Sequence, residues 1–312
     1  MKPAPSPKKL KVAMMGLGVV GGGVFRRVEA HADQFEIVKI MVRNPDKYID
    51  QGYKPDILTT EFSDLLAAKP DIFIDVSGGV EPALPHCKTM LENGVHVVSA
   101  NKQAIAAGGQ DLLDFAAAND AQLRFSSSAG GGMPVLEMCL REKGRITRVQ
   151  ALLNGTTNYM LDEIGKGKTY AEALKDAQDK GFAEADPTAD VGGADAGAKI
   201  RLIAMLGFGE TLALEDIPLD TIENFRPNAE AKGAWKRISE IWKDQNGFSS
   251  ALNLKDLSKN NFLAQADGEE AHAVFDFDDG DQYRIRGKGA GRWPTTESVM
   301  ADLFDVSETT LS

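Results

Sequence analysis

Short apolar runs alternate with longer amphipathic stretches along the first 130 residues of the chain. The apolar runs predict strands at residues 10–15, 35–42, 72–76, 95–98 and 123–125. The stretches between them predict helices at residues 24–30, 82–93 and 112–118. Strands that alternate with helices are typical of an α/β fold with a parallel, doubly wound sheet, whose ligands bind beyond the carboxyl ends of the strands.

The pattern changes after a glycine-rich run at residues 129–134, which is predicted to be a hinge. Alternating apolar positions predict a strand at residues 148–153. Helices are predicted at residues 159–164, 170–180 and 195–207. Because 312 residues are many for one hydrophobic core, the sequence predicts a second, α+β domain.

The last of these helices carries a lysine on its apolar side. Lys199 lies near the centre of the apolar stripe, and Asp195 precedes it by one helical turn. A lysine in a buried stripe is unusual unless it is paired or functional. The sequence leaves two interpretations open, a catalytic lysine and a structural ion pair with Asp195.

Composition narrows the class of protein. The net charge of −11 argues against binding to nucleic acid or to an anionic membrane surface, because both need a basic face. Two cysteines make no disulfide framework, and no apolar stretch approaches the roughly 18 residues of a membrane span. A cytoplasmic protein is therefore expected. Residues 1–9, with three prolines and three lysines, are expected to form a disordered tail.

The first predicted strand runs directly into Gly16-Leu-Gly18-Val19-Val20-Gly21. Glycines at this spacing, between a strand and a helix, are typical of a turn that binds the pyrophosphate of a dinucleotide. NAD sites prefer an acidic residue at the end of the second strand, where this chain has Arg43. A cation there can accept the 2′-phosphate of NADP, so NADP is favoured over NAD; the alternative is a solvated loop charge.

Three more segments follow predicted strands, and the fold places them near the same ligand. They are Ser77-Gly78, Asn101-Lys102 and residues 126–133. Four carboxylates precede or begin the lysine-bearing helix in a segment with little to bury. They are Glu184, Asp186, Asp190 and Asp195.

These motifs, taken in order, make the chain similar to homoserine dehydrogenases. The resemblance is carried by the glycine turn, Ala100-Asn101-Lys102, Gly130-Gly-Gly-Met-Pro134, Asn154-Gly-Thr-Thr-Asn158, Glu184-Ala-Asp186-Pro, Asp190-Val-Gly-Gly-Ala-Asp195 with Lys199, and Gly287-Lys-Gly289-Ala-Gly291 with Pro294-Thr295. It implies a Rossmann domain at residues 10–130 that residues 287–312 rejoin. It also implies a substrate-binding and dimerisation domain at residues 131–286, and hence a homodimer.

The resemblance implies NAD(P)-dependent interconversion of L-homoserine and L-aspartate 4-semialdehyde, a step of threonine, methionine and isoleucine biosynthesis. Lys199 is then expected to exchange the proton at the reacting oxygen, and Lys102 to assist beside the nicotinamide. Substrate contacts are expected from Glu184, Asp190, Asp195, Asn154, Gly155 and Thr156, and a cofactor contact from Gly289. Because the chain ends at Ser312, no C-terminal ligand-sensing domain is expected.

The resemblance further implies a monovalent cation, such as Na⁺, on main-chain carbonyls of Ser126, Ala129, Gly131 and Met133. Three departures bear on the site. Residues 126–129 read Ser-Ser-Ser-Ala where the family usually has Glu-Ala-Ser/Thr-Val, Phe182 replaces a frequent tyrosine, and Val19 replaces a common threonine.

Two alternatives stay open. Phe182 and Ser126 favour a dehydrogenase of the same family that acts on another small amino-alcohol or semialdehyde. A catalytically silent NAD(P)-binding sensor is the other, and the joint presence of Lys102, Glu184, Asp195 and Lys199 argues against it.

Overall fold

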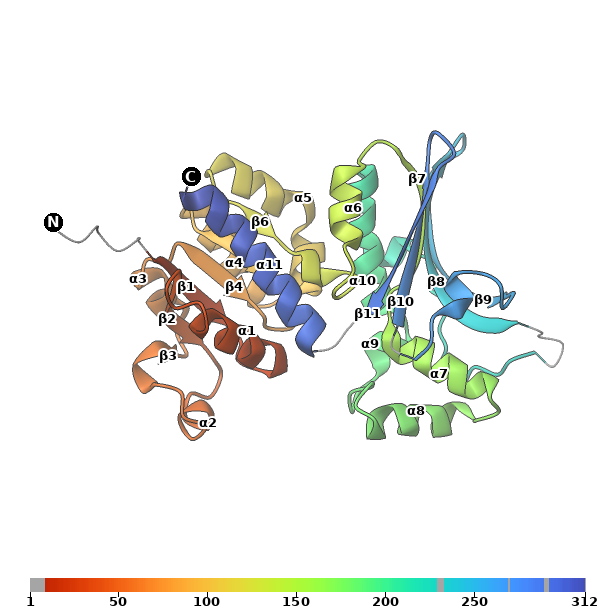
Figure 1. The fold of residues 1–312 in the computed structure, drawn as a ribbon, viewed down its shortest axis with the longest axis horizontal. Helices are drawn as coiled ribbons and strands as arrows, with labels where there is room; N and C mark the ends of the chain where they lie inside the picture. The colour runs from red at the N-terminus through yellow and green to blue at the C-terminus, as the bar shows by residue number, and fades with distance from the viewer. Residues whose placement is uncertain (1–8, 229–232, 269, 289–291, 312) are drawn as a thin grey trace. The chain divides into compact units, whose positions relative to one another are not determined.

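The computed structural model describes residues 9–228, 233–268, 270–288 and 292–311 (Figure 1). The chain forms two compact units, unit 1 (Met1–Ser128 with Thr295–Ser312) and unit 2 (Ala129–Pro294). Unit 2 ends at Pro294, later than residue 286, where the sequence predicts its end. Its last strand, β11 (Gln282–Lys288), already runs past residue 286. Most of the predicted N-terminal tail, residues 1–8, lies outside the described residues.

Unit 1 is built on a six-stranded parallel sheet, which confirms the predicted doubly wound architecture. The strand order is β3-β2-β1-β4-β5-β6, so the sheet reverses direction of winding between β1 and β4. Ligands of such sheets bind at this switch point, beyond the carboxyl ends of the strands. The strands are β1 (Leu10–Met15), β2 (Phe35–Met41), β3 (Leu58–Thr59), β4 (Ile72–Asp75), β5 (His96–Ser99) and β6 (Leu123–Arg124).

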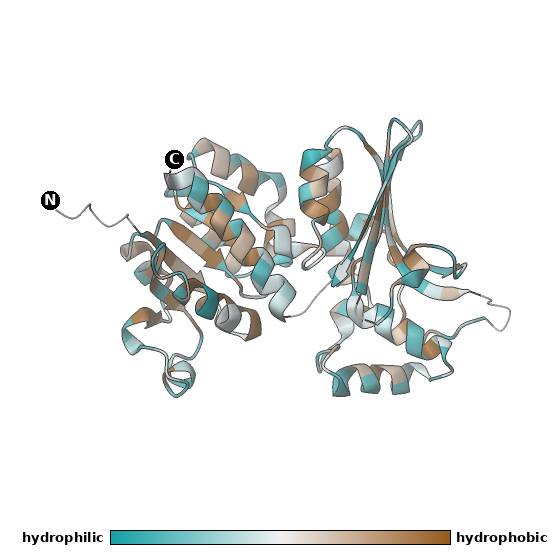
Figure 2. Ribbon diagram, viewed as in Figure 1, coloured by the Kyte–Doolittle hydropathy of each residue, from teal (hydrophilic) through white to brown (hydrophobic). Residues whose placement is uncertain are grey.

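Helices cover this sheet, and one of them comes from the far end of the chain. The helices are α1 (Val19–Glu29), α2 (Asp46–Ile49), α3 (Phe62–Ala67), α4 (Ala83–Glu92), α5 (Lys102–Ala118) and α11 (Arg292–Leu311). Alternate residues of β1, among them Val12 and Met14, pack in one buried cluster with Val24 of α1 and Leu303 of α11. Figure 2 shows hydrophobic residues along these central strands. The C-terminal helix thereby completes the N-terminal sheet.

Unit 2 is built on a five-stranded antiparallel sheet, of which the sequence predicts only β7 (Ile146–Leu152). The strand order is β11-β10-β7-β8-β9. The other strands are β8 (Ala234–Asp244), β9 (Gly247–Leu257) and β10 (Glu270–Phe277). Together with its helices, this sheet confirms an α+β second domain.

Helices α6 (Val135–Arg141) and α10 (Ala194–Ile203) lie side by side along this sheet (Figure 1). Helix α10 continues as a π-helix (Ala204–Phe208). The other helices of unit 2 are α7 (Gly155–Gly165), α8 (Tyr170–Asp179) and α9 (Thr188–Val191). Short 3₁₀ turns are formed by Pro55–Ile57, Ser126–Ser128, Leu214–Asp216 and Leu263–Gln265. Within the described ranges, every helix falls short of the length or the apolar character that crossing a membrane needs.

Three helices begin earlier than the apolar pattern predicts, because polar or glycine residues make their first turns. Helix α5 begins at residue 102, and the side chain of Asn101 caps it by accepting from the Ala104 N–H at 3.2 Å. It is interrupted at Gly109, whose φ of +52° is not helical, and the helix predicted at residues 112–118 lies in its second segment. Helix α7 begins at residue 155 rather than 159, capped in the same way by Asn154. Asparagine is a preferred N-cap residue because its side chain satisfies an N–H that has no partner inside the helix. The third is α1, which begins at Val19 rather than residue 24.

Candidate active site

The turn between β1 and α1 holds the three spaced glycines. Gly16 has a φ of +97°, and a Cβ on it would lie 2.8 Å from the carbonyl oxygen of Val76. A Cβ on Gly21 would lie 2.5 Å from the carbonyl oxygen of Gly16, closer than real Cβ atoms approach. No described atom lies within 4 Å of a Cβ built on Gly18. Two glycines therefore let the backbone pack on itself, and the third leaves an open face.

That open face lies at the N-terminus of α1. Gly18 is the N-cap residue, no side chain caps the helix, and its first turn has no acidic residue. Val19, beside it, is 70% exposed, and Val20 is half-buried. Main-chain N–H groups at a helix N-terminus attract anions, so this turn fits the pyrophosphate of a dinucleotide.

The loop after β2 carries the cation predicted to select NADP. Arg43 and Lys47 are both exposed, and the main-chain N–H of Lys47 donates to the side chain of Asn44 at 3.4 Å. No acidic residue stands at positions 41–45, where an NAD site would place one. Positions 41–45 therefore offer the positive charge of Arg43, and no carboxylate, to a ribose at this edge of the sheet.

A buried carboxylate joins the segments that follow β4 and β5. Asp75 is fully buried and accepts from the main-chain N–H of Ser77 at 3.0 Å, from its hydroxyl at 2.6 Å, and from the hydroxyl of Ser99 at 3.3 Å. Burial raises the pKa of Asp75, and these hydrogen bonds act against the rise. The side-chain amide of Asn101 donates to the carbonyl oxygen of Gly79 at 2.8 Å and lies 3.5 Å from the Ser77 hydroxyl. Two predicted cofactor residues, Ser77 and Asn101, thus belong to one network.

In unit 2, Lys199 lies on α10 and is paired as its helical spacing allows. Its ammonium donates to a carboxylate oxygen of Asp195 at 2.8 Å and to the carbonyl oxygen of Leu153. The side chains of Lys199 and Asp195 are 8% and 10% exposed. Because Leu153 directly follows β7, these contacts fix the ammonium between α10 and the end of a strand.

Asn154 links this pair to a second carboxylate. Its side-chain amide donates to Asp190 at 2.6 Å and to Asp195 at 2.9 Å. Its side-chain oxygen accepts from the main-chain N–H of Thr157 at 2.9 Å, which caps α7. Asn154, Asp190, Asp195 and Lys199 therefore form one carboxylate–lysine cluster. Such a cluster offers carboxylates to a substrate ammonium and a lysine for proton transfer.

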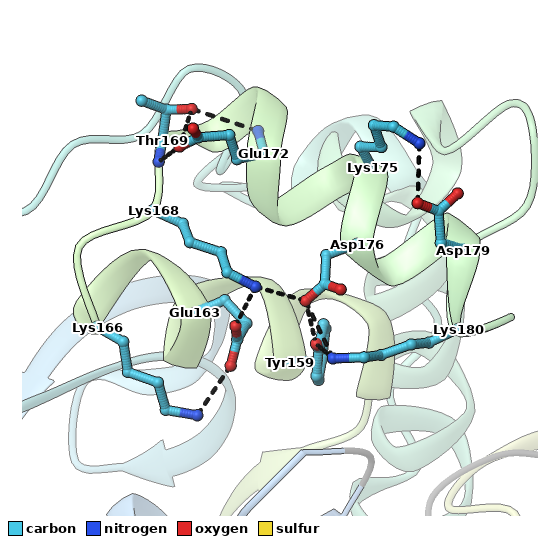
Figure 3. Close-up of polar contacts among 10 residues, drawn as sticks. All are labelled: Tyr159, Glu163, Lys166, Lys168, Thr169, Glu172, Lys175, Asp176, Asp179 and Lys180. Carbon is cyan, nitrogen blue, oxygen red and sulfur yellow. Dashed lines mark hydrogen bonds and ion pairs between the residues drawn. The ribbon is translucent and has the colours of Figure 1, made fainter.

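The remaining predicted substrate residues lie around α7. Gly155 and Thr156 are buried in its first turn, and the Thr156 hydroxyl donates to the carbonyl oxygen of Phe182 at 2.6 Å. The ring of Phe182 packs on Tyr159 with centroids 4.8 Å apart. Figure 3 shows Tyr159 among the polar contacts that hold α7 against α8. The side chain of Glu184 is exposed, and only its main-chain carbonyl makes a hydrogen bond to another described residue, Gln178.

Two family models match the chain. The model of homoserine dehydrogenase matches residues 134–304, and the model of the homoserine dehydrogenase NAD-binding domain matches residues 16–126. The chain belongs to the homoserine dehydrogenase family. It is thus an NAD(P)-dependent oxidoreductase that acts on a CH–OH group, as the sequence predicts.

Individual homoserine dehydrogenases agree with this assignment. That of Bacillus subtilis (strain 168) is 34% identical, over 96% of this chain and 73% of the relative, and that of Pseudomonas aeruginosa is 32% identical, over 96% and 72%. The crystal structure of the enzyme from Thiobacillus denitrificans has a TM-score of 0.88 at 30% identity, over 97% of this chain and 74% of that one. A hyperthermophilic archaeal homoserine dehydrogenase in complex with NADPH shares the fold, with a TM-score of 0.85 at 23% identity over 97% and 98%.

The structure distributes the residues expected of a homoserine dehydrogenase over both units. Lys102 begins α5 in unit 1, and Lys199 lies in unit 2. Of the predicted cation ligands, Ser126 lies in unit 1, and Ala129, Gly131 and Met133 are buried in unit 2. Gly289 lies outside the described residues, and Gly78 is exposed after β4.

Two buried charged residues, one in each unit of this homoserine dehydrogenase, are missing from the sequence-based expectations. Asp75 ends a short apolar strand, where it reads as the start of a loop. Arg237 lies on β8 and is 4% exposed; its guanidinium donates to the carbonyl oxygen of Val191 at 2.8 Å and to that of Asp190. Because β8 also carries Lys236 and Glu240, its apolar and polar positions do not alternate, and no pattern in the sequence singles out Arg237.

Proposed function

We propose that this member of the homoserine dehydrogenase family interconverts L-homoserine and L-aspartate 4-semialdehyde. Unit 1 would bind NAD(P), and unit 2 would bind the substrate. The observation that carries the proposal is the carboxylate–lysine cluster, in which a buried lysine and two carboxylates surround one asparagine side chain. An amino acid with a terminal hydroxyl or aldehyde needs those groups, carboxylates for its ammonium and a proton carrier for its oxygen.

When bound, NADP⁺ or NAD⁺ would supply the hydride acceptor for the oxidation of homoserine at C4. Lys199, as the amine, takes the hydroxyl proton as the C4–O bond becomes a carbonyl, and in the reverse direction its ammonium returns the proton. Asp195 holds the Lys199 nitrogen in place at 2.8 Å. Lys102 would stabilise negative charge that develops on the oxygen. Asp190 and Glu184 would hold the substrate ammonium, with Asp195.

We further propose that NADP is preferred to NAD. Arg43 is exposed directly after β2, where a cation meets the 2′-phosphate, and no acidic residue competes with it there. The archaeal relative in complex with NADPH binds this cofactor on the same fold. Gly16, Gly18, Val19, Val20 and Gly21 would cradle the pyrophosphate, and the residues after β4 and β5 would border the nicotinamide half. These last residues are Ser77, Gly78, Asn101 and Lys102.

The departure at position 182 does not favour a different substrate. The ring of Phe182 belongs with Tyr159 and Ile164 to the apolar cluster between α7 and α8. Its carbonyl, which any residue would supply, is the group that contacts Thr156. Loss of a hydroxyl from this ring therefore leaves the hydrogen bonds of the carboxylate–lysine cluster unchanged, which supports homoserine as the substrate.

Three expectations extend the proposal. A homodimer would form through the sheet of unit 2, and light scattering on dilution tests this, since a stable and active monomer contradicts it. A monovalent cation such as Na⁺ would bind main-chain carbonyls of Ser126, Ala129, Gly131 and Met133. The protein would act in a reducing cytoplasm, with which the free, buried thiols of Cys87 and Cys139 are compatible.

The decisive experiment follows absorbance at 340 nm with a panel of small amino-alcohols and each cofactor. L-homoserine should be oxidised faster than serine or threonine, and L-aspartate 4-semialdehyde should be reduced. Folded protein that turns over neither compound with either cofactor would show that the proposed reaction is wrong.

A further inference from the structure

Strand β8 carries two consecutive buried cations, Lys236 and Arg237. Their side chains are on opposite faces of the sheet, because successive residues of a strand alternate. The ammonium of Lys236 donates to Asn158 and Asp162 of α7, each at 2.7 Å. Arg237 reaches Thr157, in the first turn of the same helix. The reaction uses neither residue directly, which raises the question of what a second buried cation does beside the carboxylate–lysine cluster.

The guanidinium of Arg237 holds together the two segments that supply the cluster. Its two terminal nitrogens donate to the carbonyl oxygens of Val191 and Asp190, at the end of α9. One of them also lies 3.4 Å from the hydroxyl of Thr157, in the first turn of α7. The same two segments meet a second time through the side chains of Asp190 and Asn154, 2.6 Å apart. The carboxylate of Asp190 is thus aimed by a main chain that Arg237 fixes.

Arg237 also brings a positive charge close to the carboxylates of the cluster. Burial lowers the pKa of Arg237 to about 10, although three nearby carboxylates act against this, so the side chain is cationic at neutral pH. The carboxylates that face it are those of Asp190 on α9, Asp195 on α10, and Asp220 in the segment before β8. With Lys199 it supplies two positive charges beside the two carboxylates of the cluster.

We infer that Arg237 is a positioning residue for the substrate ammonium: it fixes the direction of Asp190 and places a second positive charge beside the two carboxylates of the cluster. This inference rests on the proposed function, because it assigns the carboxylates to the ammonium of the amino-acid substrate. Arg237 itself touches neither substrate nor cofactor in this role.

Two substitutions separate geometry from charge. Arg237→Lys keeps the charge but loses the planar pair of donors. It should raise KM for L-homoserine by about ten-fold with little change in kcat. Arg237→Met loses both, so it should raise KM by roughly 100-fold, again with little change in kcat. If Arg237→Met does not fold, Arg237→Lys decides alone.

Lys236→Met is the matched control, because it removes a cation of similar burial from the neighbouring position of the same strand. It should lower the melting temperature but leave KM and kcat for L-homoserine unchanged. The Kd of NADP, measured by fluorescence, should be unchanged in all three variants, since unit 1 is not altered. If the wild type is active but Arg237→Lys leaves KM for L-homoserine unchanged, the inference is wrong and the proposed function stands. The same holds if Lys236→Met raises this KM as much as Arg237→Lys does. A wild type that oxidises no homoserine overturns the proposed function and the inference with it.

Discussion

The Nζ atom of Lys199 lies 2.8 Å from a carboxylate oxygen of Asp195, one helical turn earlier on α10. The same oxygen accepts from Asn154 at 2.9 Å. Because this carboxylate has two donors, the loss of Lys199 does not leave it without a partner. Structural and catalytic roles of the lysine can therefore be separated by experiment.

Lys199→Met should abolish turnover in a protein that still folds. Removing one partner of a buried ion pair costs about 3–5 kcal/mol when the other charge is left uncompensated. Here Asn154 still donates to Asp195, so the loss should be smaller. Without the proton carrier, kcat should fall by roughly 10²- to 10⁴-fold, with little change in KM for homoserine. NADP binding serves as the control for folding, and near-normal turnover would leave Lys102 as the remaining candidate for proton transfer.

The open position in the glycine turn should be sensitive to one methyl group. Gly18→Ala meets no described atom within 4 Å and keeps an ordinary φ of −72°, so stability should be unchanged. Its Cβ would stand where the pyrophosphate approaches, and the Kd of NADP should rise by about ten-fold or more. Gly21→Ala is the contrasting variant, since its Cβ would lie 2.5 Å from the carbonyl oxygen of Gly16 and should lower the melting temperature. Equal NADP affinity in Gly18→Ala and wild type would show that the pyrophosphate does not bind beside Gly18.

Arg43→Asp should change the choice of cofactor. It removes a cation and adds a like charge beside the 2′-phosphate, while NAD has no phosphate there. Because a hydrogen bond to a charged group contributes about 1.5–3 kcal/mol, NADP affinity should fall by roughly 10- to 100-fold relative to NAD affinity. Fluorescence titration with both reduced cofactors measures the ratio. If the ratio does not change, Arg43 is a solvated loop charge.

Asp75→Asn should stabilise unit 1 at neutral pH. Because burial raises the pKa of Asp75, its contribution to stability is complete below the ordinary value of 3.8 and is lost as the pH rises through the higher, folded-state value. The asparagine variant cannot ionise and keeps an oxygen that accepts from Ser77. Its melting temperature should exceed that of the wild type at pH 7 to 8, and the difference should shrink toward pH 4. If the melting temperature of the variant is instead lower than that of the wild type by the same amount at every pH, the carboxylate is needed for its hydrogen bonds.

Local pattern in the sequence was enough for the parts of the protein that depend on neighbouring residues. Strand β1, the glycine turn and α1 follow one another within 20 residues, and close backbone contacts explain why Gly16 and Gly21 are glycines. The pairing of Lys199 with Asp195 follows from helical spacing alone. Alternation of strands and helices likewise predicts the parallel sheet, since that connectivity admits few topologies.

Only the tertiary structure shows which residues of the antiparallel sheet contact the segments of the carboxylate–lysine cluster. Strand β8 is buried over most of its length yet carries Lys236, Arg237 and Glu240. Its hydropathy therefore does not reveal that it is an interior strand of the sheet. Those charges are tolerated only because partners from distant segments satisfy them; the donor of Arg237 and the acceptor of Asp190 are 47 positions apart in the chain. Asn154 likewise reads as a helix cap, and only packing brings it to Asp190 and Asp195, 36 and 41 positions later. Contacts at such separations leave no period in a sequence, because they depend on which surfaces meet when the chain folds.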